Sequence, residues 1–277
     1  MQYTHISAEH RLFDLKLDEL WQYRELVWLF TRRSFIVPYK QTILGPLWLF
    51  IHPLLTSIVH LVLFGNIAKL STDGIPQLLF YLCGNAVWNY FSNCVTHNAG
   101  TFVNNANLFG KVYFPRLAIP VSNVLGDLIR FGIQMLLVLA LLAFFLIRGL
   151  VAPHWLAWLG LPLMLVQLGL LGMGVGMIIS SLTTRYRDLS VLVSFGVSLW
   201  MYATPVVYPL STVSGTLRTI LLCNPVTAPV EFFRYAVLGV GSVSVSSMAF
   251  SWAVTLLVAF VGLLIFSRVE RTFMDTV

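Results

Sequence analysis

The chain has 277 residues, of which 58% are apolar and 10% are charged, and its mean hydropathy is +0.83. Soluble domains carry about 25% charged residues, so this composition excludes an ordinary soluble enzyme and indicates a protein embedded in a lipid bilayer. The net charge of +6 lies in short segments between apolar runs, and not on one basic surface, which argues against a nucleic-acid partner.

The first predicted element is an amphipathic helix within residues 15–39. Leu17, Trp21 and Trp28 share one stripe of this helix. Its charged side chains are Arg24, Glu25, Arg32 and Arg33. Such a helix lies at a membrane interface, either as an anchor or as a docking surface for a protein, and the sequence leaves both open. Pro38 should end it, because proline cannot continue a helix.

Six long gaps between charged residues predict six transmembrane helices, since a helix needs about 20 apolar residues to cross a bilayer. The predicted spans are residues 43–64, 78–95, 117–147, 155–182, 189–208 and 246–266. The expected fold class is an all-α integral membrane protein. Residues 1–41 should form a cytoplasmic N-terminal region that contains the interface helix, and residues 42–277 the transmembrane domain.

The distribution of Lys and Arg predicts that both termini are cytoplasmic, because cytoplasmic loops carry the excess of positive charge. Twelve Lys and Arg residues then lie inside, namely Arg11, Lys16, Arg24, Arg32, Arg33, Lys40, Lys111, Arg116, Arg185, Arg187, Arg268 and Arg271. Four lie outside, namely Lys69, Arg148, Arg218 and Arg234. We therefore expect a multi-pass protein of the inner (plasma) membrane.

The second predicted span carries polar and aromatic side chains at spacings of three and four, which places them on one helical face. They are Tyr81, Asn85, Trp88, Asn89, Ser92, Asn93, Thr96 and His97. Amides facing lipid are costly, so this face must meet other helices or a water-filled path. Amides and flat rings also suit a sugar chain, and helix packing and a channel lining stay equally open.

The loop after this span, residues 97–116, places an apolar cluster on the cytoplasmic side, where it would face water. The cluster comprises Leu108, Phe109, Val112, Tyr113 and Phe114, next to Lys111. It needs a cover, which lipid head groups or a groove on a cytoplasmic partner could provide.

The third and fourth spans carry features that packing can explain. Asp127 and Arg130 lie three residues apart, and ionisable residues inside a span are functional candidates. An ion pair at this spacing accounts for them without a catalytic role. In the fourth span, Gly172 and Gly176 have the GxxxG spacing of close helix packing.

The fifth span repeats the polar pattern more weakly, with Ser194, Ser198 and Tyr202 four residues apart. With both spans taken together, the expected channel-lining or substrate-lining residues are Tyr81, Asn85, Trp88, Asn89, Tyr90, Asn93, Ser198, Tyr202 and Tyr208.

Between the fifth and sixth spans, an Asn-Pro pair at residues 224–225 separates two apolar pieces, each too short to cross a membrane. They predict helices over 214–222 and 227–237, with Thr227 as the N-cap of the second. The charged side chains of the second helix are Glu231 and Arg234. We expect a re-entrant or outer helical hairpin before the last span.

The sequence lacks the common motifs of catalytic, nucleotide-binding and metal-binding sites. We find no phosphate-binding loop, no HExxH or GxSxG motif and no paired carboxylates, so neither a catalytic site nor a metal or cofactor site is predicted. Cys83, Cys94 and Cys223 lack the spacing of a metal site or a disulfide framework. His52 and His60 are expected to pack. Since buried groups for proton coupling are few, the energy source should lie on another protein.

Three separate stretches closely resemble the permease subunits of type-2 ABC polysaccharide exporters, which serve O-antigen, capsule and teichoic acid. They read YRELVWLFTRRSFIVPYKQTILGPLW at residues 23–48, TTRYRDLSVLVSFGVSLWMYATPVVYP at residues 183–209 and NPVTAPVEFFRYAVLG at residues 224–239.

This resemblance implies a homodimer that transports a lipid-linked polysaccharide, with two copies of a separate cytoplasmic subunit that bind ATP and Mg. It also implies that the interface helix and the loop after span two contact that subunit, through Glu25, Arg32, Arg33, Leu108, Phe109, Lys111, Val112, Tyr113 and Phe114. An outer gate region would contain Asn224, Pro225, Glu231 and Arg234. Arg185, Arg187 and Asp188 match an RYRDL stretch of the family, where an ion-pair role is equally open.

Other functions remain compatible with the sequence. One is an ATP-independent carrier, and another is an integral-membrane enzyme that acts on lipid-linked sugars. A type-2 ABC exporter of a substrate other than a glycan is the third.

Overall fold

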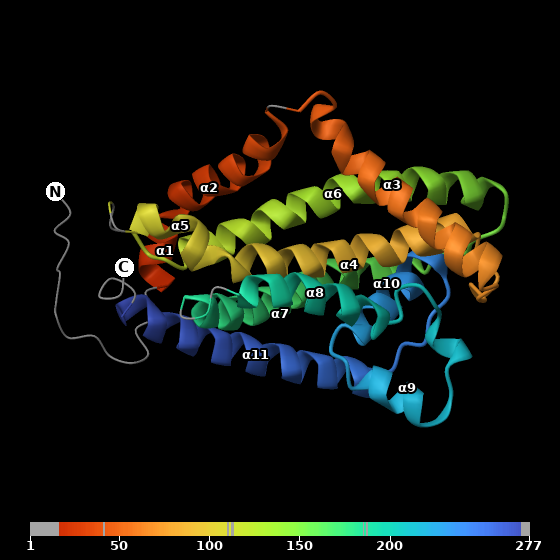
Figure 1. Ribbon diagram of the computed structural model, residues 1–277. Coiled ribbons are helices and arrows are strands. Elements are labelled where there is room, and N and C mark those ends of the chain that lie inside the picture. The colour runs from red at the N-terminus through yellow and green to blue at the C-terminus, as the bar shows by residue number, and fades with distance from the viewer. Residues whose placement is uncertain are drawn as a thin grey trace.

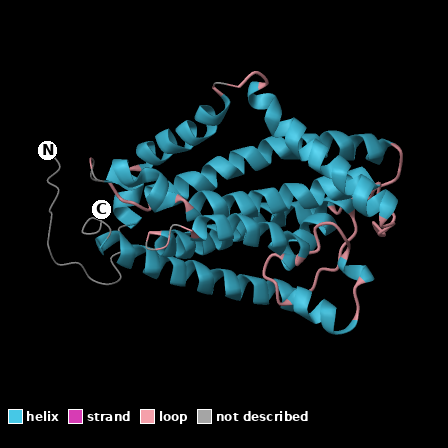
Figure 2. Cartoon of the chain, viewed as in Figure 1, coloured by secondary structure: helices cyan, strands magenta, loops and turns pink. Residues whose placement is uncertain are grey.

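The computed structural model describes residues 17–40, 42–109, 111, 114–184, 186 and 188–272. Throughout these residues every regular element is helical (Figure 2), which confirms the predicted all-α fold. In chain order the elements are α1 (Leu17–Gln22), α2 (Arg24–Ile36), η1 (Val37–Tyr39), η2 (Gly45–Leu47), α3 (Trp48–His60), the π-helix η3 (Leu61–Ile67), α4 (Gln77–Ala99), α5 (Thr101–Phe109), α6 (Ala118–Ile147), η4 (Trp155–Gly160), α7 (Leu161–Thr183), α8 (Leu189–Tyr202), η5 (Leu210–Thr212), α9 (Gly215–Leu222), α10 (Thr227–Leu238) and α11 (Val245–Thr272).

The long helices lie side by side in one bundle (Figure 1). α4 packs against both α6 and α7, and α7 packs against α11 on another side. α1, α5 and the last turns of α11 lie at one end of the bundle, which we call the α5 end. α9 and the first turn of α11 lie at the opposite end, the α9 end.

Each predicted span corresponds to a helix in the bundle. Four helical stretches are long and apolar enough to cross a membrane, namely Gly45–Ile67, Ala118–Ile147, Trp155–Thr183 and Val245–Glu270. α4 has 23 residues but carries the polar stripe. α8 has 14 residues, about 21 Å at 1.5 Å per residue, against a hydrocarbon core of about 30 Å. A membrane protein is confirmed, and the number of six spans stays a prediction.

Prolines set several helix ends. α2 ends at Ile36, and Pro38 lies in the short turn η1 that follows, as predicted. The Asn-Pro pair separates α9 from α10, which confirms the two short helices. The prediction that Thr227 caps α10 is wrong. Because Pro225 has no N–H, the carbonyl of Leu221 has no donor four residues later, and the Thr227 hydroxyl donates to it instead at 2.7 Å.

Glycines of α7 bring helices into backbone contact. A Cβ atom at Gly172 would lie 2.6 Å from the Cβ of Cys94 on α4, and Gly176 faces Asn98 on the same helix. Gly174 faces Ala259 and Gly262 of α11. The prediction that the GxxxG pair serves packing is therefore confirmed, and α4, α7 and α11 meet with little side-chain volume between them.

A second apolar cluster closes the α5 end. Phe109 and Phe114 are buried there with Phe102, and the Phe102 ring stacks on Phe266 of α11 at a centroid distance of 4.6 Å. Val27 of α2 covers another side. The expectation that Phe109 and Phe114 face water is wrong, because α2 and α11 of the same chain cover them.

Candidate functional site

The predicted ion pair in α6 is part of a larger network at its N-terminal third. Asp127 is 1% exposed, and its Oδ1 accepts a hydrogen bond from Arg130 Nη1 at 2.6 Å, so the predicted pair is confirmed. His97 Nδ1 of α4 lies 2.9 Å from both carboxylate oxygens. A carboxylate only accepts, so this ring nitrogen carries the proton.

Arg130 also reaches a third helix. Its Nη2 donates to the carbonyl of Ser34 in α2 at 2.7 Å. The residue four positions after Ser34 is Pro38, which has no N–H, so this carbonyl lacks its helical donor. Arg130 therefore supplies the hydrogen bond that α2 cannot make for itself, and the Asp127 network joins α2, α4 and α6.

Of the residues predicted to dock an ATP-binding subunit, the charged ones are exposed and the described apolar ones are buried or half-buried. Glu25, Arg32 and Arg33 are exposed on α2, and Lys111 is exposed after α5. Leu108 is half-buried, and Phe109 and Phe114 are buried in the second cluster. Val112, Tyr113, Arg185 and Arg187 lie outside the described residues. A docking role for the exposed charges stays a prediction.

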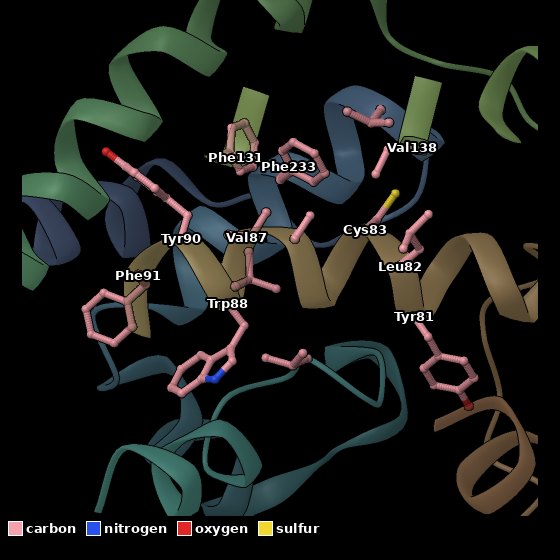
Figure 3. Close-up of a cluster of buried hydrophobic side chains, with 14 of the residues drawn as sticks. Tyr81, Leu82, Cys83, Val87, Trp88, Tyr90, Phe91, Phe131, Val138 and Phe233 are labelled. Atoms are coloured by element: carbon pink, nitrogen blue, oxygen red, sulfur yellow. The ribbon is translucent and has the colours of Figure 1, made fainter. Parts of the chain in front are cut away.

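The polar and aromatic side chains of α4 are mostly taken up by contacts within the chain. The Asn85 amide donates to Ser57 Oγ of α3 at 2.9 Å, and the Tyr90 hydroxyl donates to the carbonyl of Leu165 in α7 at 3.2 Å. Trp88 and Tyr90 point to opposite sides of the helix (Figure 3). Tyr81 is buried too. These four residues therefore serve the helix packing that the sequence left open as the alternative.

Asn89 and Asn93 of α4 are only half-buried. Ser92 and Thr96 of the same stripe are half-buried as well. A lining role for Asn89 and Asn93 stays a prediction.

α8 exposes the other part of the predicted lining. Ser198 and Tyr202 are exposed, and Tyr202 is 54% exposed. The Ser198 hydroxyl donates to the carbonyl of Ser194 at 2.8 Å, which leaves its oxygen free to accept. Tyr208 is half-buried, and its hydroxyl donates to the carbonyl of Tyr202 at 3.1 Å.

Two of the predicted outer gate residues, Asn224 and Arg234, contact the irregular segment 203–208, which follows α8. The Asn224 amide donates to the carbonyl of Ala203 at 2.9 Å and to the Thr204 hydroxyl at 2.8 Å. Its oxygen accepts from Trp200 Nε1 at 3.2 Å. The Pro225 carbonyl accepts from Ser251 Oγ of α11 at 2.5 Å.

Arg234 of α10 binds the same segment from the interior. Its side chain is 1% exposed and donates to the carbonyls of Pro205 and Val206, at 2.6 Å each, and of Tyr208 at 3.3 Å. Glu231 accepts from Arg234 at 3.2 Å, as predicted from their spacing, and also from the backbone N–H of Ser242 at 2.9 Å. Segment 203–208 is therefore fixed by side-chain donors in place of helical hydrogen bonds.

Sequence reasoning missed the partners that complete both networks. His97 stood at the end of the polar stripe of α4, but nothing in the spacing paired it with Asp127. The one available signal for Ser34 was Pro38, which predicts an unpaired carbonyl four residues earlier. Among the described residues, no group of three or more His, Cys, Asp and Glu side chains could hold a metal ion.

Comparisons with known proteins agree over most of the chain. The model of the family described as "ABC-2 type transporter" matches residues 25–238. An "O-antigen export system permease protein RfbA" of Klebsiella pneumoniae is 27% identical over 253 residues, which cover 91% of this chain and 94% of that protein. A protein with the same description from Myxococcus xanthus is 31% identical over 215 residues, covering 76% of this chain and 79% of that protein.

Proposed function

The chain belongs to the ABC-2 type transporter family, and on that premise we propose that it is the membrane subunit of an ATP-driven exporter of a lipid-linked polysaccharide of the O-antigen type. The observation that carries the proposal is that relatives described as O-antigen export permeases match this chain over nearly their whole length. Transport, and not a reaction catalysed by this chain, is then its function.

ATP binding would take place on a separate cytoplasmic subunit. The sequence has no phosphate-binding loop of its own. The α5 end would face the cytoplasm in this proposal, in line with the excess of Lys and Arg that the sequence places there. Glu25, Arg32 and Arg33 of α2 and Lys111 after α5 offer exposed charges for docking.

A second copy of the chain would complete the transport path. α8 is too short to cross a bilayer alone, and its exposed surface combines the Ser198 hydroxyl with the Tyr202 ring. Hydroxyl acceptors and aromatic rings suit the hydroxyls and the apolar faces of sugars. We therefore assign the lining of the transport path to α8 of each copy. α4 is the less suitable helix, because most of its polar and aromatic side chains are used in packing.

The test is purification of the tagged chain from its native membrane in mild detergent, with mass spectrometry of co-purifying proteins and an ATPase assay. We expect a stoichiometric subunit with a phosphate-binding loop and vanadate-sensitive ATP hydrolysis. Deletion of the gene should leave lipid-linked polysaccharide inside the cell. A chain that purifies alone, with no ATP hydrolysis, would favour the carrier or membrane-enzyme alternatives.

A further inference from the structure

The Asp127 network lies where α2, α4 and α6 meet. Asp127 is the tenth residue of α6, about 14 Å from its start at 1.5 Å per residue. A buried carboxylate inside an apolar helix is costly unless it is paired and hydrogen-bonded. Here it accepts from Arg130 and from His97, and it has less than 2% exposed surface.

The contact with α2 is close as well as polar. A Cβ atom at Gly126 would lie 2.8 Å from Ser34 Oγ, so α6 and α2 approach closely next to the network. One turn earlier, the Thr31 hydroxyl lies 3.4 Å from the carbonyl of Ser122. Arg130 therefore does more than neutralise Asp127, since its planar fork holds α2 against α6.

The contact with α4 extends into α5. His97 lies in the last turn of α4, which ends at Ala99, and α5 begins at Thr101. Asn123 of α6 donates to the His97 carbonyl at 3.3 Å. α2 carries exposed docking candidates, and α5 precedes Lys111, which is another one. The Asp127 carboxylate, through Arg130 and His97, thus links α2 to the end of α4 from which α5 continues.

We infer that Asp127 and Arg130 join α2, the end of α4 with α5, and α6 into one rigid body that transmits movement from the ATP-binding subunit to the bundle. This inference rests on the proposed function. Asp127 and Arg130 act as positioning residues: neither needs to touch the transported molecule or the nucleotide. Loss of the link between α2 and α6 should uncouple ATP hydrolysis from export.

Arg130→Lys tests the link, because it keeps a positive charge beside Asp127 but replaces the two-nitrogen fork by a single nitrogen. In the purified complex with its ATP-binding subunit, we expect ATP hydrolysis to persist while polysaccharide export per ATP falls about fivefold or more, which is the lower end of measured coupling effects. Arg148→Lys at the other end of α6 is the matched control, since Arg148 is exposed, and it should leave this ratio unchanged.

A second variant separates coupling from simple stability. Pro38→Ala restores an N–H that can reach the carbonyl of Ser34, so the double variant Pro38→Ala with Arg130→Lys satisfies α2 internally while the link to α6 stays broken. We expect the double variant to regain thermal stability and to keep the low export per ATP. If the double variant regained wild-type export per ATP together with its thermal stability, Arg130 would have a structural role only, and the inference would be overturned.

Movement can also be measured without the transported molecule. Spin labels at Trp28→Cys of α2 and Asn107→Cys of α5 would be placed in a Cys223→Ser background, because Cys223 is exposed while Cys83 and Cys94 are buried. The distance between the labels should be the same without nucleotide and with ADP and vanadate. Arg130→Lys should broaden the distribution of distances. A wild-type distance that changes with nucleotide would overturn the rigid body. Failure of the proposed function would be distinct, since no ATP-binding subunit would then co-purify.

Discussion

The guanidinium carbon of Arg234 lies 4.0 Å from the centre of the Phe80 ring, so a fully buried cation of α10 stacks on an aromatic side chain of α4. Its nitrogens meanwhile bind the carbonyls of segment 203–208. Desolvated contacts of this kind contribute about 2 kcal/mol or more. One side chain therefore joins α4, α10 and the segment that follows α8.

Arg234→Ala should destabilise the protein by about 3–5 kcal/mol, because it leaves the Glu231 carboxylate buried and unpaired and removes the donors of three carbonyls. Arg234→Lys should lose less, since an ammonium can still pair with Glu231. Unfolding in mixed micelles, followed by tryptophan fluorescence, measures both. Equal stability of the alanine variant and the wild type would show that the contacts of Arg234 with Glu231 and segment 203–208 do not stabilise the protein.

Gly84→Ala should destabilise the same region by about 1–3 kcal/mol, the usual cost of overpacking. A Cβ atom at Gly84 would lie 2.5 Å from the Val206 carbonyl and 3.2 Å from Arg234 Nη2. Gly132→Ala in α6 is the control, because nothing lies within 4 Å of its Cβ position, and it should be neutral or stabilising by up to about 1 kcal/mol. The same unfolding measurement compares the two, and similar losses in both would argue against a close contact at Gly84.

Phe109→Ala should cost about 3–5 kcal/mol of stability, because Phe109 is a large buried side chain of the second cluster. Arg33→Glu should change stability by less than about 0.5 kcal/mol, since Arg33 is exposed. Its effect should appear instead as weaker co-purification of the ATP-binding subunit. If Phe109→Ala kept full stability and lost only the partner, that result would favour the predicted docking role of Phe109 over a role in the core.

Tyr202→Ala should lower polysaccharide export about two- to tenfold, which corresponds to one aromatic contact of about 0.5–1.5 kcal/mol. Leu257→Ala on α11, where Leu257 is 62% exposed, is the matched control on a surface with no proposed lining role. Surface polysaccharide per molecule of folded protein is the measurement. Export that is equal in the two variants would remove α8 from the transport path.

Much of the fold could be predicted because charges and prolines act locally. The apolar stretches between charged residues located the long helices. Pro38 and the Asn-Pro pair located the ends of α2 and α9. Thr227 was misassigned as a cap because its hydroxyl donates to the Leu221 carbonyl, which cannot receive the usual helical hydrogen bond from Pro225 and also accepts from the N–H of Asn224. The position of a proline in the sequence shows which backbone carbonyl loses its helical donor. Which side chain donates to that carbonyl instead depends on how the chain packs.

The same limit applies to the candidate site. A polar stripe specifies which face of α4 must avoid lipid, but it does not specify whether a helix or a water-filled path lies opposite. Asn85 meets Ser57, a residue 28 positions away in the sequence. The cover of Phe109 and Phe114 likewise comes from α2 and α11, which lie far apart in the chain. Spacing within one helix carries no information on such contacts.

The backbone contacts that Gly172, Gly174 and Gly176 make with α4 and α11 also bear on how the protein opens locally. Neither α4 nor α11 can move away from α7 without exposing the apolar surface that it shares with α7. The amide protons of these three helices should therefore exchange with solvent deuterium at similar, slow rates. α3 has Pro53 within it and continues into a π-helix, and α8 leaves most of its surface uncovered. Amides of these two helices should exchange earlier, which makes them the part of the subunit that can change shape while the glycine-packed helices stay intact.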